Sequence, residues 1–147
     1  MKLVGMTEPV RIYISAMETR YDDHASIDPK AQELIDRVRD AGYNVYWNKI
    51  WRPYPEILAD IAASSAMLVI VDSTWTSSSW MAVEASWAFG EAGVGEDMID
   101  PIPVFVYPVI APSQFGWLKG RLDKLMVLDS DVATAVSQID RALASIG

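Results

Sequence analysis

The chain has 147 residues, of which 51% are hydrophobic and 22% are charged, a composition typical of one globular domain over residues 1–147. The formal net charge of −8 argues against nucleic acid and anionic membranes as partners, because binding to phosphate groups needs a basic surface. No cysteine, no signal-peptide pattern and no apolar run near the ~20 residues that span a bilayer occur, so we expect a cytoplasmic protein without disulfides or thiolate metal sites.

The chain opens with a strand pattern and a helix pattern that are separated by a polar segment. Residues 10–16 alternate apolar with polar side chains, which predicts a β-strand. Residues 17–28 predict a loop that is long for a compact domain, and such loops often carry function. A helix is then predicted from the pair Asp28-Pro29, with Asp28 as its N-cap, to Gly42 as its C-cap.

A second strand and a second helix follow, with an aromatic loop between them. Residues 43–47 are rich in aromatic and β-favouring side chains and predict the strand. Residues 48–55 form the predicted loop, which holds tryptophan, tyrosine and two prolines. Pro55 opens the helix, and the fully apolar run at residues 67–71 then predicts a buried third strand.

The stretch after the third strand is the most informative part of the sequence. The strand ends at Asp72, and a polar loop leads to a helix that begins near Trp80, with Ser79 as the predicted N-cap. Trp80 and Glu84 are four residues apart and therefore lie on one face of this helix. A carboxylate is thus placed beside an aromatic side chain at the sheet edge where open α/β folds bind ligands. The alternative is a solvated helix glutamate favoured by the helix dipole.

The remaining sequence completes an alternating pattern. Its predicted elements, in order, are a flexible connection at residues 90–100, a strand at 104–107, a short helix near 114–119, a strand at 125–128 and a last helix capped by Asp129 or Ser130. Strands that alternate with helices indicate parallel strands joined by right-handed crossovers, with helices on both faces. We therefore predict an α/β fold of the flavodoxin-like, doubly wound kind, with a five-stranded parallel sheet.

Several kinds of catalytic site have little support in the sequence. His24 is the only histidine and follows two aspartates, but a solvated loop is more expected there than a metal site or a catalytic dyad. The chain has no Gly-x-Ser-x-Gly elbow and no glycine-rich phosphate loop, which argues against serine hydrolases, dinucleotide-dependent hydride transfer and phosphoryl transfer. Asp72 could be a receiver-domain phosphoacceptor, but Ala16-Met17 stands where that class has an acidic pair.

Several segments carry a resemblance to one known family. They are Ile12-Tyr13-Ile14-Ser15 in the first strand, Gly42 to Tyr46 at the entry to the second, the loop from Trp47 to Tyr54, the passage from Ile57 to Asp72, and Ser77 to Glu84. Together they resemble a TIR domain over almost the whole chain, with residues 47–54 as the family's BB loop. The last segment is similar to the Ser-x-x-Trp-x-x-x-Glu motif that opens helix αC of that family.

The resemblance implies a function. In the enzymatic branch of the family, the motif glutamate cleaves the nicotinamide–ribose bond of NAD+, so Glu84 is the catalytic candidate and NAD+ is a substrate rather than a cofactor. The motif further implies contacts to the substrate from five residues: Trp80 as a pocket wall, Tyr46 stacking on a base, Ser15 at the pocket floor, Ser77 in the motif and Arg20 near a phosphate. No metal is implied. Ala16-Met17-Glu18 replaces the family's basic residues after the first strand.

The resemblance also implies a homo-oligomer formed through the BB loop and helix αC, in immune or cell-death signalling such as antiphage defence. Two alternatives stay open. A nucleoside 2-deoxyribosyltransferase-like enzyme also places a glutamate after the third strand, but its Asp-x-Gly-Thr-type segment is absent. A non-enzymatic TIR adaptor would use the same surfaces for assembly only. For Glu84 itself, apolar neighbours are expected to raise the carboxyl pKa and the helix N-terminus to lower it.

Overall fold

The computed structural model describes residues 10–17, 19–21, 24–47, 53–91 and 99–145, with the backbone alone for 19–21 and 24–26. Its main sheet has five strands: β1 (Arg11–Ser15), β4 (Asn44–Trp47), β5 (Ala66–Val71), β6 (Val104–Pro108) and β7 (Met126–Val127). The strands lie in the order β4-β1-β5-β6-β7 and every pair is parallel. This is the strand order of flavodoxin-like folds, and the predicted fold class is confirmed.

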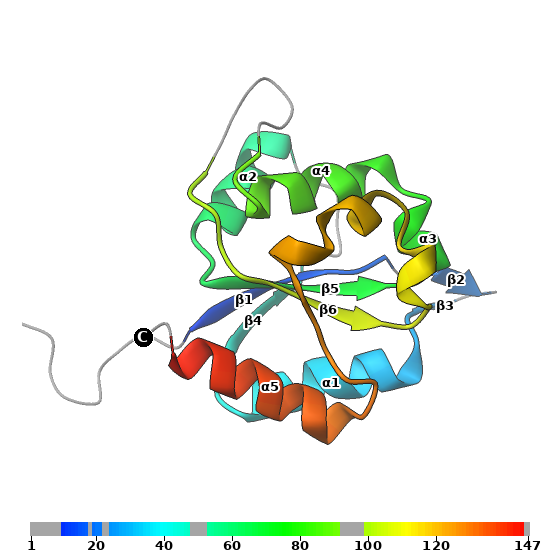
Figure 1. Cartoon of the computed structure of the whole chain (residues 1–147), viewed down its shortest axis with the longest axis vertical. Coiled ribbons are helices and arrows are strands. Elements are labelled where there is room, and N and C mark those ends of the chain that lie inside the picture. Colours follow the sequence, from blue (N-terminus) through cyan, green and yellow to red (C-terminus); the bar gives the residue numbers. More distant parts are fainter. Residues whose placement is uncertain (1–9, 18, 22–23, 48–52, 92–98, 146–147) are drawn as a thin grey trace, which may run out of the picture.

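Helices cover both faces of the sheet (Figure 1). Helices α1 (Pro29–Asp40) and α5 (Val132–Ala144) lie on one face, while α2 (Tyr54–Ala62) and α4 (Ser79–Ala88) lie on the other. The side chains of β1, β5 and β6 alternate between two apolar cores, one under each helix layer, whereas both residues of β7 are exposed. Because helices bury both faces, the polar side chains of β1 also point into a core, and Tyr13 and Ser15 are each 1% exposed. None of the described helices is long and apolar enough to cross a bilayer.

The first helix forms largely as the sequence predicts. The Asp28 carboxylate accepts hydrogen bonds from the backbone N–H groups of Lys30 and Ala31, and Pro29 occupies the first turn. Its buried stripe consists of Ala31, Leu34, Ile35 and Val38. The predicted C-cap is off by one residue: Ala41 is the C-cap, and Gly42 follows it with φ 103°, a left-handed conformation that favours glycine.

Two segments that were predicted to be loops contain secondary structure. The first, residues 17–28, contains the antiparallel pair β2 (Thr19–Tyr21) and β3 (His24–Ser26), in which short polar strands satisfy one another's backbone groups. The second is the segment after β5, which contains the short helix α3 (Ser73–Thr76). This turn forms because the Asp72 carboxylate caps it, accepting from the Trp75 backbone N–H at 2.7 Å, and because the Trp75 ring is buried.

Two predicted N-caps were also wrong. Helix α4 is capped by Ser78 instead of Ser79, since the Ser78 hydroxyl accepts from the Met81 backbone N–H at 3.3 Å. Helix α5 is capped by Asp131, whose carboxylate accepts from the Thr134 N–H at 3.0 Å. Asp129 instead accepts from the Asp131 backbone N–H in the preceding turn. In each case several neighbouring residues can cap, and tertiary packing selects one of them.

The region between β6 and β7 is more helical than predicted. Two 3₁₀ helices, η2 (Pro112–Gln114) and η3 (Gly116–Lys124), take the place of one short helix. Arg121 of η3 binds Glu91, just beyond α4, through two hydrogen bonds of 2.9 Å, and its guanidinium lies 3.6 Å from the centre of the Trp117 ring. This Arg121–Glu91 clamp joins the end of α4 to η3. The predicted flexible connection lies partly outside the described residues, which resume at Ile99.

Candidate functional site

Glu84 lies in the middle of α4 and is 4% exposed. The helix sequence SWMAVEASWA has no continuous polar face, and a helix that is apolar on nearly all sides is buried. Its one carboxylate is consequently buried with it, against the sheet face that carries Tyr13. The structure excludes the interpretation of Glu84 as a solvated helix glutamate.

The Glu84 carboxylate has a specific partner on the interior strand β1. The hydroxyl of Tyr13 donates to Oε1 of Glu84 at 3.0 Å, a buried contact between residues 71 positions apart. Burial raises the pKa of Tyr13 above the usual range for tyrosine, and the adjacent Glu84 raises it further. Tyr13 is therefore a protonated hydrogen-bond donor at all physiological pH values.

Burial also dominates the electrostatics of Glu84. Desolvation raises the pKa of Glu84 to about 7, while the hydrogen bond from Tyr13 and the neighbouring Trp80 side chain act in the opposite direction. The sequence predicted that apolar surroundings would raise this pKa, and burial is its largest cause, but the opposing influences come from side chains and not from the helix N-terminus. Near neutral pH this carboxylate exchanges a proton readily, as general bases and charge-stabilising groups in active sites do.

A second polar cluster lies beside Tyr13 on the same sheet face. Tyr46 on β4 is the register partner of Tyr13, and the two rings stack with centroids 5.7 Å apart. The Tyr46 hydroxyl donates to Asp60 of α2 at 2.9 Å, and Arg11 forms an ion pair with Asp60 at 3.4 Å. The Arg11 guanidinium also lies 4.4 Å from the centre of the Tyr46 ring. The Tyr46 ring is thus held by three residues, and stacking of a base on it stays a prediction.

Ser15 lies at the carboxyl end of β1, next to β5. The chain passes from β1 to β4 on one side of β1 and then crosses back to β5 on the other side, so the strand order reverses between β1 and β5. Doubly wound folds bind ligands outside the carboxyl ends of the strands at such a point. The Ser15 hydroxyl accepts from the Trp75 indole N–H at 3.0 Å and contacts the Met81 sulfur at 3.6 Å. Ser15 therefore connects β1 to α3 and to the first turn of α4, one turn before Glu84.

Trp80 belongs to a group of aromatic rings beside the carboxylate. The rings of Trp80 and Trp87 meet edge to face with centroids 5.8 Å apart, and Tyr54 of α2 stacks on Trp87 at 6.3 Å. Trp87 is fully buried, whereas Trp80 is half-buried. The predicted neighbourhood of Trp80 and Glu84 is present, and Trp80 is the more accessible of the two side chains.

The structure brings some of the predicted site residues together and leaves others apart. Four of them lie on one face of the sheet: Glu84 and Trp80 on α4, Tyr46 on β4 and Ser15 on β1. Tyr13 contacts both Glu84 and Tyr46, and Ser15 contacts Met81 of α4. Ser77 is exposed at the end of α3, where its hydroxyl bonds the Ser73 carbonyl oxygen at 2.8 Å. The Arg20 backbone lies in β2, and its side chain is outside the described residues.

Sequence reasoning missed Tyr13, Asp60 and Trp75. Tyr13 was assigned only to the polar side of an alternating strand. The signal that identifies it is the doubly wound fold itself, because a tyrosine in a central strand covered on both faces is buried and its hydroxyl needs a partner. Trp75 was missed because four residues after a strand give no periodic signal for a helix.

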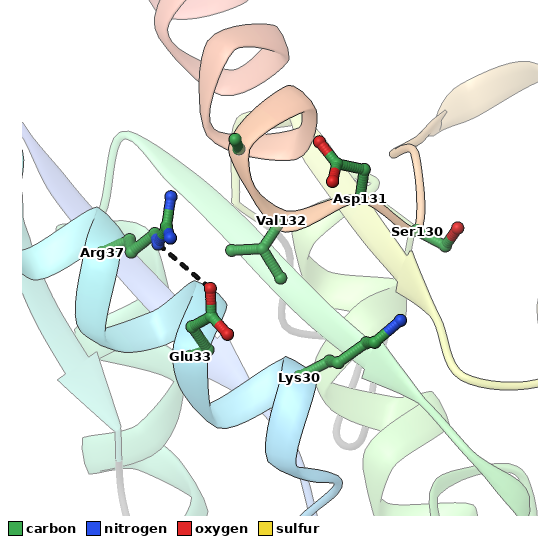
Figure 2. A pocket seen from close by; sticks show the side chains of 7 residues that line it. Lys30, Glu33, Arg37, Ser130, Asp131 and Val132 are labelled. Carbon is green, nitrogen blue, oxygen red and sulfur yellow. Dashed lines mark ion pairs between the residues drawn. The ribbon is translucent and has the colours of Figure 1, made fainter.

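A separate cleft of about 170 Å³ lies between α1 and α5, on the opposite face of the sheet (Figure 2). Its lining residues are Lys30, Glu33, Arg37, Ser130, Asp131, Val132 and Ala133. The charges of this cleft largely compensate one another: Arg37 pairs with Glu33 at 3.1 Å. None of the predicted site residues lines it. Among the described residues, no group of three histidine, aspartate or glutamate side chains is arranged to hold a metal ion.

No family model matches the chain, and no curated protein matches it either. The fold and the buried carboxylate thus define a flavodoxin-like α/β protein with a candidate active site centred on Glu84.

Proposed function

We propose that this protein is an NAD+ nucleosidase, a hydrolase or ADP-ribosyl cyclase, in which Glu84 is the catalytic residue. The observation that carries the proposal is a carboxylate buried on one face of a doubly wound sheet, which accepts a hydrogen bond from Tyr13 one helical turn from the contact of α4 with Ser15 at the carboxyl end of β1. Burial raises the pKa of this carboxylate to about 7. The resemblance of Ser77 to Glu84 to the TIR motif supports the choice of NAD+ as substrate.

One carboxylate is sufficient for this reaction. When the bond between C1′ of the ribose and N1 of nicotinamide breaks, the bonding electrons neutralise the positive pyridinium nitrogen, so the leaving group needs no proton. The ribose is left with oxocarbenium character, which the anionic form of Glu84 stabilises in a low-dielectric surrounding. Water then adds to C1′ and releases a proton, giving nicotinamide and ADP-ribose; in a cyclase, an adenine nitrogen attacks in place of water.

The substrate must reach a carboxylate that is 4% exposed. Trp80 lies one helical turn from Glu84 and is itself half-buried, so rotation of its indole would open the carboxylate and leave an aromatic wall for the nicotinamide or ribose. Ser15 would contribute at the pocket floor and Tyr46 by stacking. We further propose that the protein acts in the cytoplasm as a homo-oligomer in immune or cell-death signalling, the setting that the resemblance implies.

The burial of Glu84 also bears on the alternatives. A buried carboxylate whose pKa is raised lowers the stability of the fold at neutral pH, and an adaptor that uses only its surface has no need of such a group. A 2-deoxyribosyltransferase-like enzyme would use the same carboxylate, so the substrate decides between the two. Release of nicotinamide from NAD+, without base release from 2′-deoxynucleosides, would support the nucleosidase.

The deciding experiment is incubation of the purified protein with NAD+ over a wide range of protein concentrations, with nicotinamide measured by chromatography. Glu84→Gln keeps the shape of the side chain and removes its charge, and we expect it to lower turnover at least ~1,000-fold, as loss of a main charge-stabilising group does. Glu33→Gln on the opposite face is the matched control and should retain wild-type turnover. Unchanged turnover in Glu84→Gln, or no nicotinamide from the wild type at any concentration, would refute the proposal.

A further inference from the structure

Tyr13 is held more firmly than any other partner of the candidate catalytic carboxylate. It lies in the middle of the interior strand β1, between Tyr46 of β4 and Met67 of β5 in the sheet register. Its side chain is 1% exposed, and its ring stacks on Tyr46. A side chain fixed by two neighbouring strands and by ring stacking keeps its hydroxyl in one place.

Tyr13 and Trp80, which both lie beside Glu84, therefore differ in mobility. Trp80 lies on the first turn of α4 and is half-buried, so it can move when a substrate enters. Tyr13 belongs to the sheet and cannot move without disturbing the core. Its O–H group is directed at Oε1 of Glu84, which leaves Oε2 as the oxygen that Tyr13 does not bind.

We propose that Tyr13 is the positioning residue of the active site: its hydroxyl holds Oε1 of Glu84 so that the charged carboxylate presents Oε2 to the ribose carbon of the substrate. This inference rests on the proposed function for the identity of the substrate. The contact between Tyr13 and Glu84 itself is independent of the reaction.

The hydrogen bond also favours the ionised form of Glu84, which is the form that stabilises the transition state. The other ionisable groups around the pair are Tyr46 on β4, Asp60 on α2 and Arg11 on β1, with Tyr54 of α2 beyond Trp87. Asp60 is paired with Arg11, so the cluster adds little net charge beside Glu84. The Tyr13 hydroxyl is consequently the polar contact whose removal should change the titration of Glu84 most.

Tyr13→Phe tests the proposal, because it deletes one oxygen and keeps the ring that stacks on Tyr46. We expect the titration midpoint of Glu84, followed by NMR of carbon-13-labelled glutamate side chains, to rise by about one pH unit. The acid limb of kcat/KM for NAD+ should move upward by the same amount. At pH 6 the variant should be about tenfold slower than the wild type, and the difference should be much smaller where Glu84 is fully ionised.

Tyr107→Phe is the control. Tyr107 is 2% exposed, lies on the opposite face of the sheet and donates to the Ser130 carbonyl oxygen at 2.7 Å, so its variant loses the same atom from a similar environment. It should leave the Glu84 midpoint unchanged. If Tyr13→Phe does not fold, 3-fluorotyrosine at position 13 keeps the hydroxyl and makes it a stronger donor, which should lower the midpoint.

The possible results separate the two proposals. If the Glu84 midpoint stays the same in Tyr13→Phe and with 3-fluorotyrosine, the positioning role is overturned while the nucleosidase can stand. If kcat/KM falls equally at all pH values with no change of midpoint, Tyr13 contributes packing only and the proposal also fails. If the midpoint moves but the wild type releases no nicotinamide, the proposed function fails and the link between Tyr13 and Glu84 is retained.

Discussion

The indole N–H of Trp75 donates to Oγ of Ser15 at 3.0 Å, and both side chains are 1% exposed. This contact joins α3, the short helix after β5, to the end of β1, at the point where the strand order reverses. It fixes two of the elements that border the candidate site with one buried hydrogen bond.

The first prediction concerns this contact. Trp75→Phe removes the donor and part of the ring, and we expect a loss of about 2–4 kcal/mol in the free energy of unfolding from the cavity and the lost hydrogen bond. Urea denaturation of Trp75→Phe, Ser15→Ala and the double variant measures the pair. A coupling energy of about 1 kcal/mol is expected, and strict additivity of the two single variants would show that the hydrogen bond contributes nothing.

The second prediction concerns stability and pH. The pKa of Glu84 is raised from its ordinary value of 4.5 to about 7, so protonation of Glu84 stabilises the folded protein below pH 4.5, and this stabilisation is lost as the pH rises through 7. Between these limits the free energy of unfolding falls by about 3 kcal/mol. Glu84→Gln, which carries no charge, should therefore unfold at higher temperature than the wild type at pH 8, with a smaller gain at pH 5. A gain that does not depend on pH would contradict the burial of an ionisable Glu84.

The third prediction is the pH profile of turnover, which rests on the proposed function. The ionised carboxylate is the active form, so kcat/KM for NAD+ should be half-maximal near pH 7 and fall about tenfold for each further pH unit below 6. No loss is expected up to about pH 9, since Tyr13 stays protonated there and the leaving group needs no acid. A bell-shaped profile with an alkaline limb below pH 9 would indicate a catalytic acid, with His24 or a tyrosine as the first residue to test.

The fourth prediction concerns assembly. The loop predicted at residues 48–55 includes Trp51, which lies outside the described residues, while helix α2 already begins at Tyr54. Tryptophan is among the side chains that most often anchor protein interfaces. If a neighbouring copy completes the active site, nicotinamide release per molecule should rise with protein concentration, and Trp51→Ala should flatten that rise. Analytical ultracentrifugation over the same concentrations provides the parallel measurement. A constant specific activity over a 100-fold range would argue against assembly through this loop.

The sequence predicted the fold class because the apolar strands and the apolar faces of the helices are regular in this chain. Residues 67–71 are too short and too apolar for anything but a buried strand between two helix patterns, and Asp28-Pro29 marks a helix start because aspartate caps the first turn and proline fits it. Boundaries were less accurate where neighbouring residues compete for one role. Ser78 and Ser79 can both cap α4, and only the packing of the helix on the sheet selects Ser78.

The candidate site was predictable only in part. The Trp80 and Glu84 pair follows from helical spacing, which is local information. The link from Tyr13 to Glu84 is not local: it depends on how α4 crosses β1, and nothing in either segment specifies that crossing. The pKa of Glu84 could not be predicted in magnitude either, because desolvation depends on the whole surrounding core and not on the neighbours in the helix.

Helix α4 contacts β1 near its start, where the Met81 sulfur meets Oγ of Ser15, and it is joined to η3 just beyond its end by the Arg121–Glu91 clamp. These contacts oppose sliding of the helix along its axis, so we expect Glu84 to keep its height above the sheet when a ligand binds. The motion needed for ligand entry is then confined to side chains such as Trp80. Rotations of partly exposed side chains occur in nanoseconds, whereas shifts of whole helices take microseconds or longer. Ligand association at this site should therefore show a single kinetic phase, without a slow backbone step.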